Sequence, residues 1–109
     1  MHFFGNFLIL FLEEDIYFKA DLGYDCSTKT LVSTESDCEM AANQVGYEYK
    51  NDLTRDDRPM GCYWVHGSSN KVYFNNLLER PSDTSIGGDR GGLCKGKKFQ
   101  ILVLHFYMI

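Results

Sequence analysis

The stretch RPMGCYWVHGSSNKVYFNN, residues 58–76, specifies local structure more closely than any other part of this chain. Its segments CYWVH (62–66) and KVYFN (71–75) are rich in aromatic and β-branched residues, which favour strands. Between them, GSSN (67–70) has the length and residue types of a hairpin turn. The stretch therefore predicts a β-hairpin.

The two faces of this hairpin differ in what they can contact. Alternation along a strand places Cys62, Trp64 and His66 on one face and Tyr63 and Val65 on the other. If Cys62 forms a disulfide with Cys38, its face lies under a helix. We then expect Tyr63 and Val65 to face away from the helix, towards solvent or a partner.

Residues 33–46, STESDCEMAANQVG, are predicted as the single helix. Ser33 or Thr34 can cap its N-terminus, and acidic residues in the first turn suit the positive end of the helix dipole. The apolar stripe at helical spacing consists of Cys38, Ala41, Ala42 and Val45. Gly46 ends the helix, because a residue without a Cβ adopts the left-handed conformation at little cost. These small side chains would let the helix pack closely against a sheet.

The four cysteines are widely spaced and form no C-x-x-C pair, which argues against a zinc knuckle or a thioredoxin-like motif. An even number of cysteines in a small acidic chain predicts two disulfides and an oxidising compartment. Three pairings are open. We prefer the nested one, Cys26–Cys94 with Cys38–Cys62, because the sequential alternative leaves the helix untethered to the hairpin.

The rest of the chain predicts a single α+β domain over residues 16–98, with one helix packed on a small antiparallel sheet and two disulfides. A first strand is expected at 16–24 and surface loops at 48–60 and 79–92, the latter flexible because of its glycines. Residues 1–15 form a signal-like or mispredicted N-terminal segment, or an apolar strand. Residues 99–109 form an apolar C-terminal tail or a final strand.

Several function classes are disfavoured by composition. The net charge of −4 argues against nucleic-acid binding, and the one basic cluster, at 95–98, reads as a solvated segment. The chain contains no calcium-loop pattern, and its glycine-rich run lacks the context of a phosphate-binding loop. His66 is the one histidine away from the termini, and it has no evident catalytic partners. We therefore expect no catalysis, no metal and no cofactor.

A set of residues across positions 20–95 resembles small cysteine-containing modules that recur, often in several copies, in secreted or surface proteins of microalgae and other marine protists. The matching residues are Cys26, Leu31, Val32, Ser33, Thr34, Cys38, Glu39, Ala41, Ala42, Gly46, Pro59, Gly61, Cys62, Tyr63, Val72, Tyr73, Phe74, Asn75 and Cys94. A helix disulfide-bonded to a sheet is also distantly similar to apple/PAN modules, although their common third disulfide is absent here. This resemblance implies a secreted or surface location, extracellular binding of proteins or carbohydrates, and neighbouring copies of the module in a longer protein.

The leading functional expectation is an extracellular recognition module that binds carbohydrate or protein. Tyr63, Tyr73, Asn75 and the 82–92 loop are the first candidate contacts, because exposed aromatic faces commonly bind sugars or proteins. The structural alternative for these residues is a packed sheet face with Asn75 capping a turn. Two further alternatives are a secreted effector or inhibitor that presents the 82–92 loop, and a small enzyme built around His66.

Overall fold

The computed structural model describes residues 2–4, 7–67, 70–80 and 85–105. Within them lie one helix and six strands: β1 His2–Phe4, β2 Phe7–Lys19, α1 Glu35–Val45, β3 Glu48–Leu53, β4 Gly61–Val65, β5 Lys71–Asn75 and β6 Arg90–His105. The strands form one sheet in the order β1-β2-β6-β4-β5-β3. The fold is α+β, as predicted. The sheet is mixed rather than antiparallel, because β3 pairs in parallel with β5.

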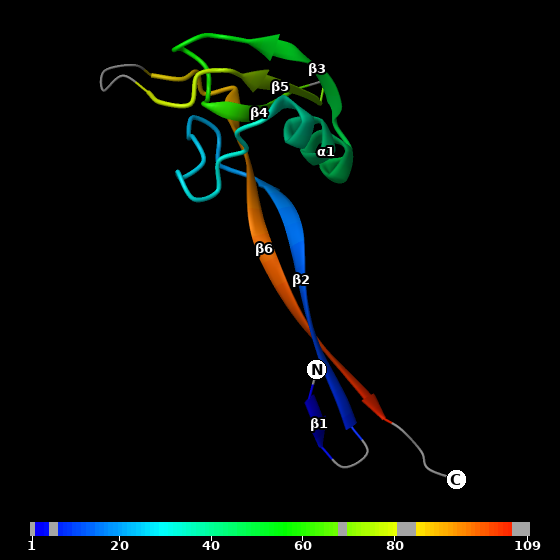
Figure 1. Cartoon of the computed structure of the whole chain (residues 1–109). Helices are drawn as coiled ribbons and strands as arrows, with labels where there is room; N and C mark the ends of the chain where they lie inside the picture. Colours follow the sequence, from blue (N-terminus) through cyan, green and yellow to red (C-terminus); the bar gives the residue numbers. More distant parts are fainter. Residues whose placement is uncertain (1, 5–6, 68–69, 81–84, 106–109) are drawn as a thin grey trace.

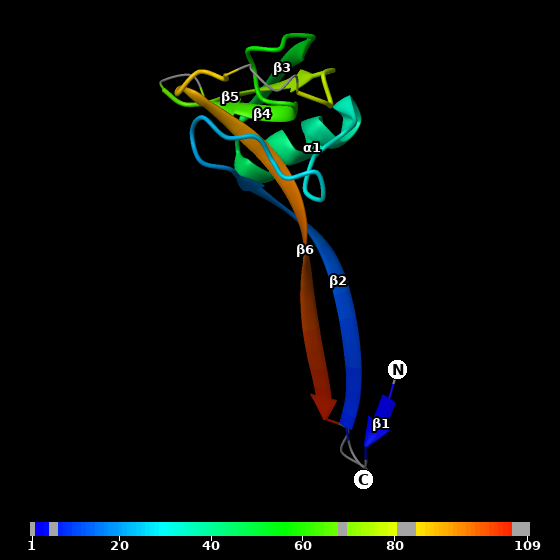
Figure 2. The ribbon, with the colours of Figure 1, turned by 90° about the vertical axis from the view of Figure 1, so that its left-hand side faces the viewer.

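The chain divides into a head and a protruding ribbon (Figures 1 and 2). The head contains α1, β3, β4, β5 and the first part of β6. The ribbon consists of β2 and β6, which pair in antiparallel register from Phe7↔His105 to Lys19↔Leu93. Since β6 also pairs with β4, this strand connects the ribbon to the head.

The predicted hairpin forms as β4 and β5. Tyr63 faces Tyr73 across the pair, and Trp64 faces Val72. Cys62 and Trp64 lie in the core, as the alternation predicts, and the Trp64 indole N–H donates to the Ala20 carbonyl at 3.1 Å.

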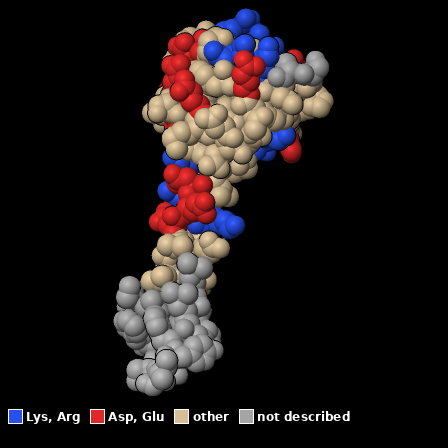
Figure 3. All heavy atoms as spheres, turned by 90° about the vertical axis from the view of Figure 1, so that its right-hand side faces the viewer, with Lys and Arg blue, Asp and Glu red and all other residues tan. Residues whose placement is uncertain are grey.

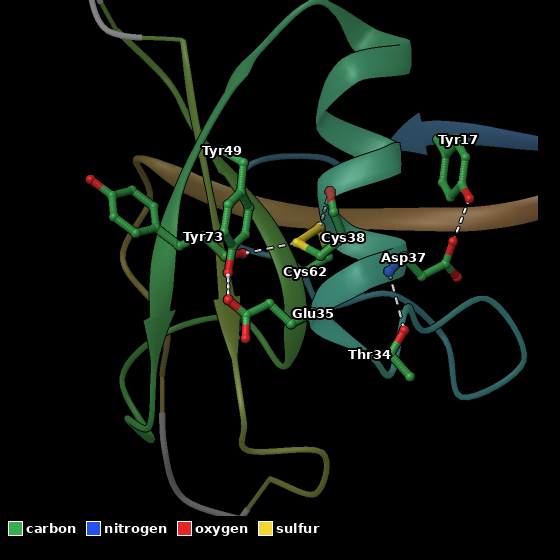
Figure 4. Close-up of a disulfide and its surroundings, with 8 residues drawn as sticks. All are labelled: Tyr17, Thr34, Glu35, Asp37, Cys38, Tyr49, Cys62 and Tyr73. Carbon is green, nitrogen blue, oxygen red and sulfur yellow. Dashed lines mark hydrogen bonds between the residues drawn. A yellow bond between two sulfur atoms is a disulfide. The ribbon is translucent and has the colours of Figure 1, made fainter.

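Helix α1 covers one face of this hairpin. Thr34 is its N-cap and accepts from the Asp37 backbone N–H at 3.2 Å, and Gly46 ends it at φ +77°. Ala41 and Ala42 are fully buried, so the small side chains bring the helix close to the sheet. The Cys38–Cys62 disulfide joins the two layers, as Figure 4 shows. The helix and its caps confirm the sequence prediction.

Strand β3 corrects the prediction of a loop over 48–60. Residues 48–53 pair with β5 at the edge of the sheet, with a register shift between Tyr49 and Asp52. The Tyr49 ring packs against the core while its hydroxyl donates to Glu35 at 2.8 Å. An edge strand with mostly exposed side chains carries no clear alternating pattern, and for this reason the sequence did not reveal it.

The glycines near Cys94 serve close packing rather than flexibility. The predicted loop 79–92 overlaps β6, whose first residues include Gly91 and Gly92. A Cβ on Gly91 would lie 2.8 Å from the Ala20 carbonyl oxygen, and one on Gly92 would lie 2.7 Å from the Cys26 sulfur. Residues 20–26 therefore cross β6 closely. Of the strand predicted at 16–24, only residues 16–19 are in a strand, and residues 20–24 belong to this crossing segment. Residues 81–84 of this loop lie outside the described residues.

The predicted domain boundaries fall within continuous strands. Residues 16–19 continue β2, and residues 99–105 belong to β6, which agrees with the interpretation of a final strand. Apolar side chains on this ribbon are exposed, with Phe99 at 74% and Ile101 at 61%. Nearer the head, Lys97 bonds the Asp15 carboxylate and Lys95 lies 3.5 Å from it. Figure 3 shows acidic and basic side chains side by side on this part of the ribbon.

Both predicted disulfides are present, Cys26–Cys94 and Cys38–Cys62, and their pairing is nested. Two disulfides in so small a chain indicate an oxidising, extracellular-type environment. In the described part of the chain, the single helix is too short to cross a membrane.

Candidate functional site

The sheet face opposite α1 carries two stacked tyrosines. The rings of Tyr63 and Tyr73 lie 5.5 Å apart with an interplanar angle of 19°. Tyr63 lies on this face, away from the helix as expected, but it is only 2% exposed and therefore does not face solvent. Tyr73 is half-buried, and Figure 4 shows its side chain pointing away from the helix and the disulfide. Of the two, Tyr73 is the one that a ligand can reach.

An open hollow of about 240 Å³ lies against this pair, and we call it the Arg–Tyr hollow. It is lined by Leu53, Arg55, Arg58, Tyr63, Val65, Tyr73 and Arg90. Arg55 and Arg58 lie on the loop between β3 and β4 (residues 54–60), and Arg90 begins β6. Two separate segments thus bring three guanidinium groups around one aromatic pair.

Asn75 positions the loop that carries two of these arginines. Its side-chain amide is fully buried and donates to the Arg55 and Pro59 carbonyls at 2.7 and 3.0 Å. Its carbonyl oxygen accepts from the backbone N–H groups of Arg55 and Leu77, both at 3.1 Å. Asn75 is therefore a positioning residue, which fits the turn-capping alternative better than the expected ligand contact.

Arg80 also holds the loop between β3 and β4 in place. Its guanidinium forms a bidentate pair with Asp25 at 2.7 and 2.9 Å. It also donates to the Asp56 and Arg58 carbonyls. The hydrogen bond to Asp25 raises the pKa of Arg80, so its guanidinium stays charged. Asn75 and Arg80 together bind the backbone carbonyls of this loop, so the backbone positions of Arg55 and Arg58 are fixed.

Asp57 orients two of the hollow's arginines. Arg55 donates to it through Nε and Nη2, both at 2.8 Å, and Arg58 Nη1 lies 3.0 Å from the same carboxylate. The hydrogen bond from Arg55 lowers the pKa of Asp57, and the same bond raises the pKa of Arg55. The pair therefore remains ionised over the physiological range.

Arg90 and the buried Tyr63 are two further ionisable groups that line the hollow. Arg90 Nη1 lies 3.1 Å from Asp89. Burial raises the pKa of Tyr63, and the charges of Arg58 and Arg90 oppose that shift. The hollow thus combines a neutral phenol, an accessible aromatic ring and three cations. These groups can donate hydrogen bonds and stack, and they provide no activated nucleophile.

Two larger hollows offer less chemistry. One of about 440 Å³ lies on the outer side of α1 against Met40, Asn43 and Gln44. The other, of about 320 Å³, includes Lys95 and Lys97 in its lining. Lys95 donates to Asp37 at 3.0 Å and Lys97 to Asp15, and these bonds raise the pKa of both lysines. We therefore place the site at the smaller Arg–Tyr hollow.

The remaining sequence candidates lie elsewhere. His66 is exposed beyond the end of β4, with its ring edge-on to Trp64 at 6.3 Å, and it does not line the Arg–Tyr hollow. No cluster of three His, Cys, Asp or Glu side chains suited to a metal occurs in the described part of the chain. The 82–92 loop falls partly outside the described residues, and its last three positions belong to β6.

Sequence reasoning missed the three arginines of the hollow. The motif RDDR at 55–58 was the available signal, but it reads as an ordinary polar loop until the fold brings it beside Tyr73. The chain matches no protein-family model, and the searches of curated proteins and of solved structures return no significant match. The geometry of this site is therefore the basis for inferring its function.

Proposed function

We propose that this chain is an extracellular or cell-surface recognition module that binds carbohydrate in the Arg–Tyr hollow and performs no catalysis. The observation that carries the proposal is the placement of three positioned guanidinium groups around the accessible ring of Tyr73. Aromatic rings stack on the C–H groups of sugars, and arginine forks donate paired hydrogen bonds to sugar oxygens.

The size and openness of the hollow support a polymeric ligand. Its volume of about 240 Å³ is below the ~300–1,000 Å³ of typical enclosed small-molecule pockets. A hollow of this size accommodates one unit of a longer chain while the rest of the polymer extends over the surface. The oxidising environment indicated by the disulfides agrees with ligands found outside the cell.

A binding screen of the oxidised protein against immobilised glycans and cell-surface proteins tests this proposal. We expect glycan binding that Tyr73→Ala weakens ~10-fold, about 1.4 kcal/mol. Tyr24→Ala is the matched control, because Tyr24 is 65% exposed and does not line the hollow. Binding to surface proteins and to no glycan would replace carbohydrate by a protein ligand. Absence of binding by folded protein, or equal effects of the two variants, would refute the proposed site.

A further inference from the structure

The arginines of the chain are concentrated at the Arg–Tyr hollow. Three of its four arginines line the hollow, and none of the seven lysines does. Figure 3 shows Lys and Arg side chains, with Asp and Glu side chains beside them, at the end of the head remote from the ribbon. This use of arginine matters chemically, because the planar guanidinium matches carboxylate and sulfate oxygens in pairs, whereas an ammonium acts as a point charge.

The charged side chains that line the hollow are all cationic. Their partner carboxylates, Asp57 beside Arg55 and Arg58 and Asp89 beside Arg90, are not among the lining residues. The chain as a whole carries −4. A polyanion is therefore repelled by most of the surface, and it needs a local cationic site to bind.

One arginine keeps donors available for a ligand. A guanidinium has five N–H donors. In the described part of the chain, the Arg55 guanidinium donates only to Asp57, through Nε and Nη2, which leaves its Nη1 group for a ligand. The Arg55 side chain is 53% exposed, so a ligand can approach it.

We propose that the Arg–Tyr hollow is selective for anionic carbohydrate, with a carboxylate or sulfate oxyanion of one sugar unit bound between Arg55 and Arg90 and the sugar ring against Tyr73. This inference rests on the proposed function and makes it narrower. Asp57 holds the Arg55 fork in place, and Asn75 and Arg80 hold the loop, so the site needs little reordering when the oxyanion binds.

Matched pairs of polymers test the inference by biolayer interferometry or calorimetry. Dextran sulfate is compared with dextran, and polygalacturonate with its fully methyl-esterified form. We expect one or both anionic polymers to bind at least 10-fold more tightly than their neutral counterparts. Tight binding of dextran sulfate identifies sulfate as a ligand group, and tight binding of polygalacturonate identifies carboxylate. Binding should weaken as ionic strength rises.

Charge-matched variants separate the site from general electrostatics. Arg55→Gln and Arg90→Gln should each weaken anionic binding ~10-fold, since each variant loses a charge-assisted hydrogen bond to the oxyanion. Lys29→Gln removes the same charge from an exposed turn and should leave affinity within about 2-fold. Arg55→Lys should recover only part of the loss, because an ammonium cannot pair with Asp57 through a planar fork and also present a fixed N–H group to the ligand.

Three results would overturn the proposed anion selectivity. Equal binding of anionic and neutral polymers, with the arginine variants unaffected, would overturn anion selectivity and leave the recognition module standing. Equal losses in the lysine and arginine variants would show nonspecific attraction and overturn the inference. Absence of binding to every polymer by protein that is folded by circular dichroism would overturn both proposals.

Discussion

Replacing Asn75 by alanine tests the structural basis of the site. The side chain makes four well-placed hydrogen bonds, to the Arg55 and Pro59 carbonyls and from the Arg55 and Leu77 backbone N–H groups. Net contributions of about 0.5–1.5 kcal/mol per bond give roughly 2–6 kcal/mol. Water can reach part of the exposed loop, so we expect a loss of ~3 kcal/mol, a large share of a typical stability of about 5–15 kcal/mol.

Urea denaturation followed by the fluorescence of Trp64, the single and buried tryptophan, measures this loss. Asn76→Ala is the matched control: Asn76 is exposed and donates to Asp52 at 3.1 Å and to the Leu53 carbonyl at 2.9 Å. We expect that variant to lose less than ~1 kcal/mol. If Asn75→Ala costs no more than Asn76→Ala at an unchanged m-value, the argument that Asn75 holds the loop is wrong.

Three other predictions concern the frame of the molecule. Removing the inner disulfide by Cys38→Ala with Cys62→Ala should cost ~3.4 kcal/mol for a 24-residue separation, and a loss below ~1 kcal/mol in urea would contradict this. Burial and the neighbouring carboxylate raise the pKa of Tyr17 to about 12 from 10.0. Its contribution to stability should therefore be complete below pH 10 and fall as pH rises through about 12; an equal fall in Tyr17→Phe would refute this. Gly91→Ala should cost ~1–3 kcal/mol through overpacking, whereas Gly88→Ala, with open space around it, should be neutral in thermal unfolding; equal effects would contradict the crossing at β6.

The helix and hairpin could be predicted because their signals are local. The caps at Thr34 and Gly46 bound an apolar stripe of helical period, and the alternation in CYWVH assigns Cys62 and Trp64 to the core. The nested disulfides follow from these two elements, because the residues that face each other across the two layers include Cys38 and Cys62.

The parts that were missed depend on long-range contacts. Strand β3 is held at a sheet edge by β5, and only Tyr49 and Leu53 of its six side chains are partly buried. The glycines at 91 and 92 look like a flexible loop until residues 20–26 are seen to cross them. Such contacts leave no periodic pattern in the sequence.

The site was predicted in part for the same reason. Strand alternation places Tyr63 and Tyr73 on the face opposite the helix, but it does not reveal that Tyr63 is covered there. Arg55 and Arg58 reach this face because Asn75 binds the Arg55 backbone across 20 residues of sequence, and Arg90 reaches it as the first residue of β6. Asn75, which was expected to touch a ligand, instead holds the backbone of the loop that carries Arg55 and Arg58.

Side-chain NMR of the arginines tests the central claim most directly. The Nε–Hε signals of ¹⁵N-labelled protein are followed during titration with an oligogalacturonate and with a sulfated oligosaccharide. We predict saturable shifts of the Arg55 and Arg90 signals with at least one of them, together with the backbone signals of the loop between β3 and β4. Shifts confined to the lysines at 95–98, or no saturable shift with either ligand, would contradict the assignment of the Arg–Tyr hollow as the binding site.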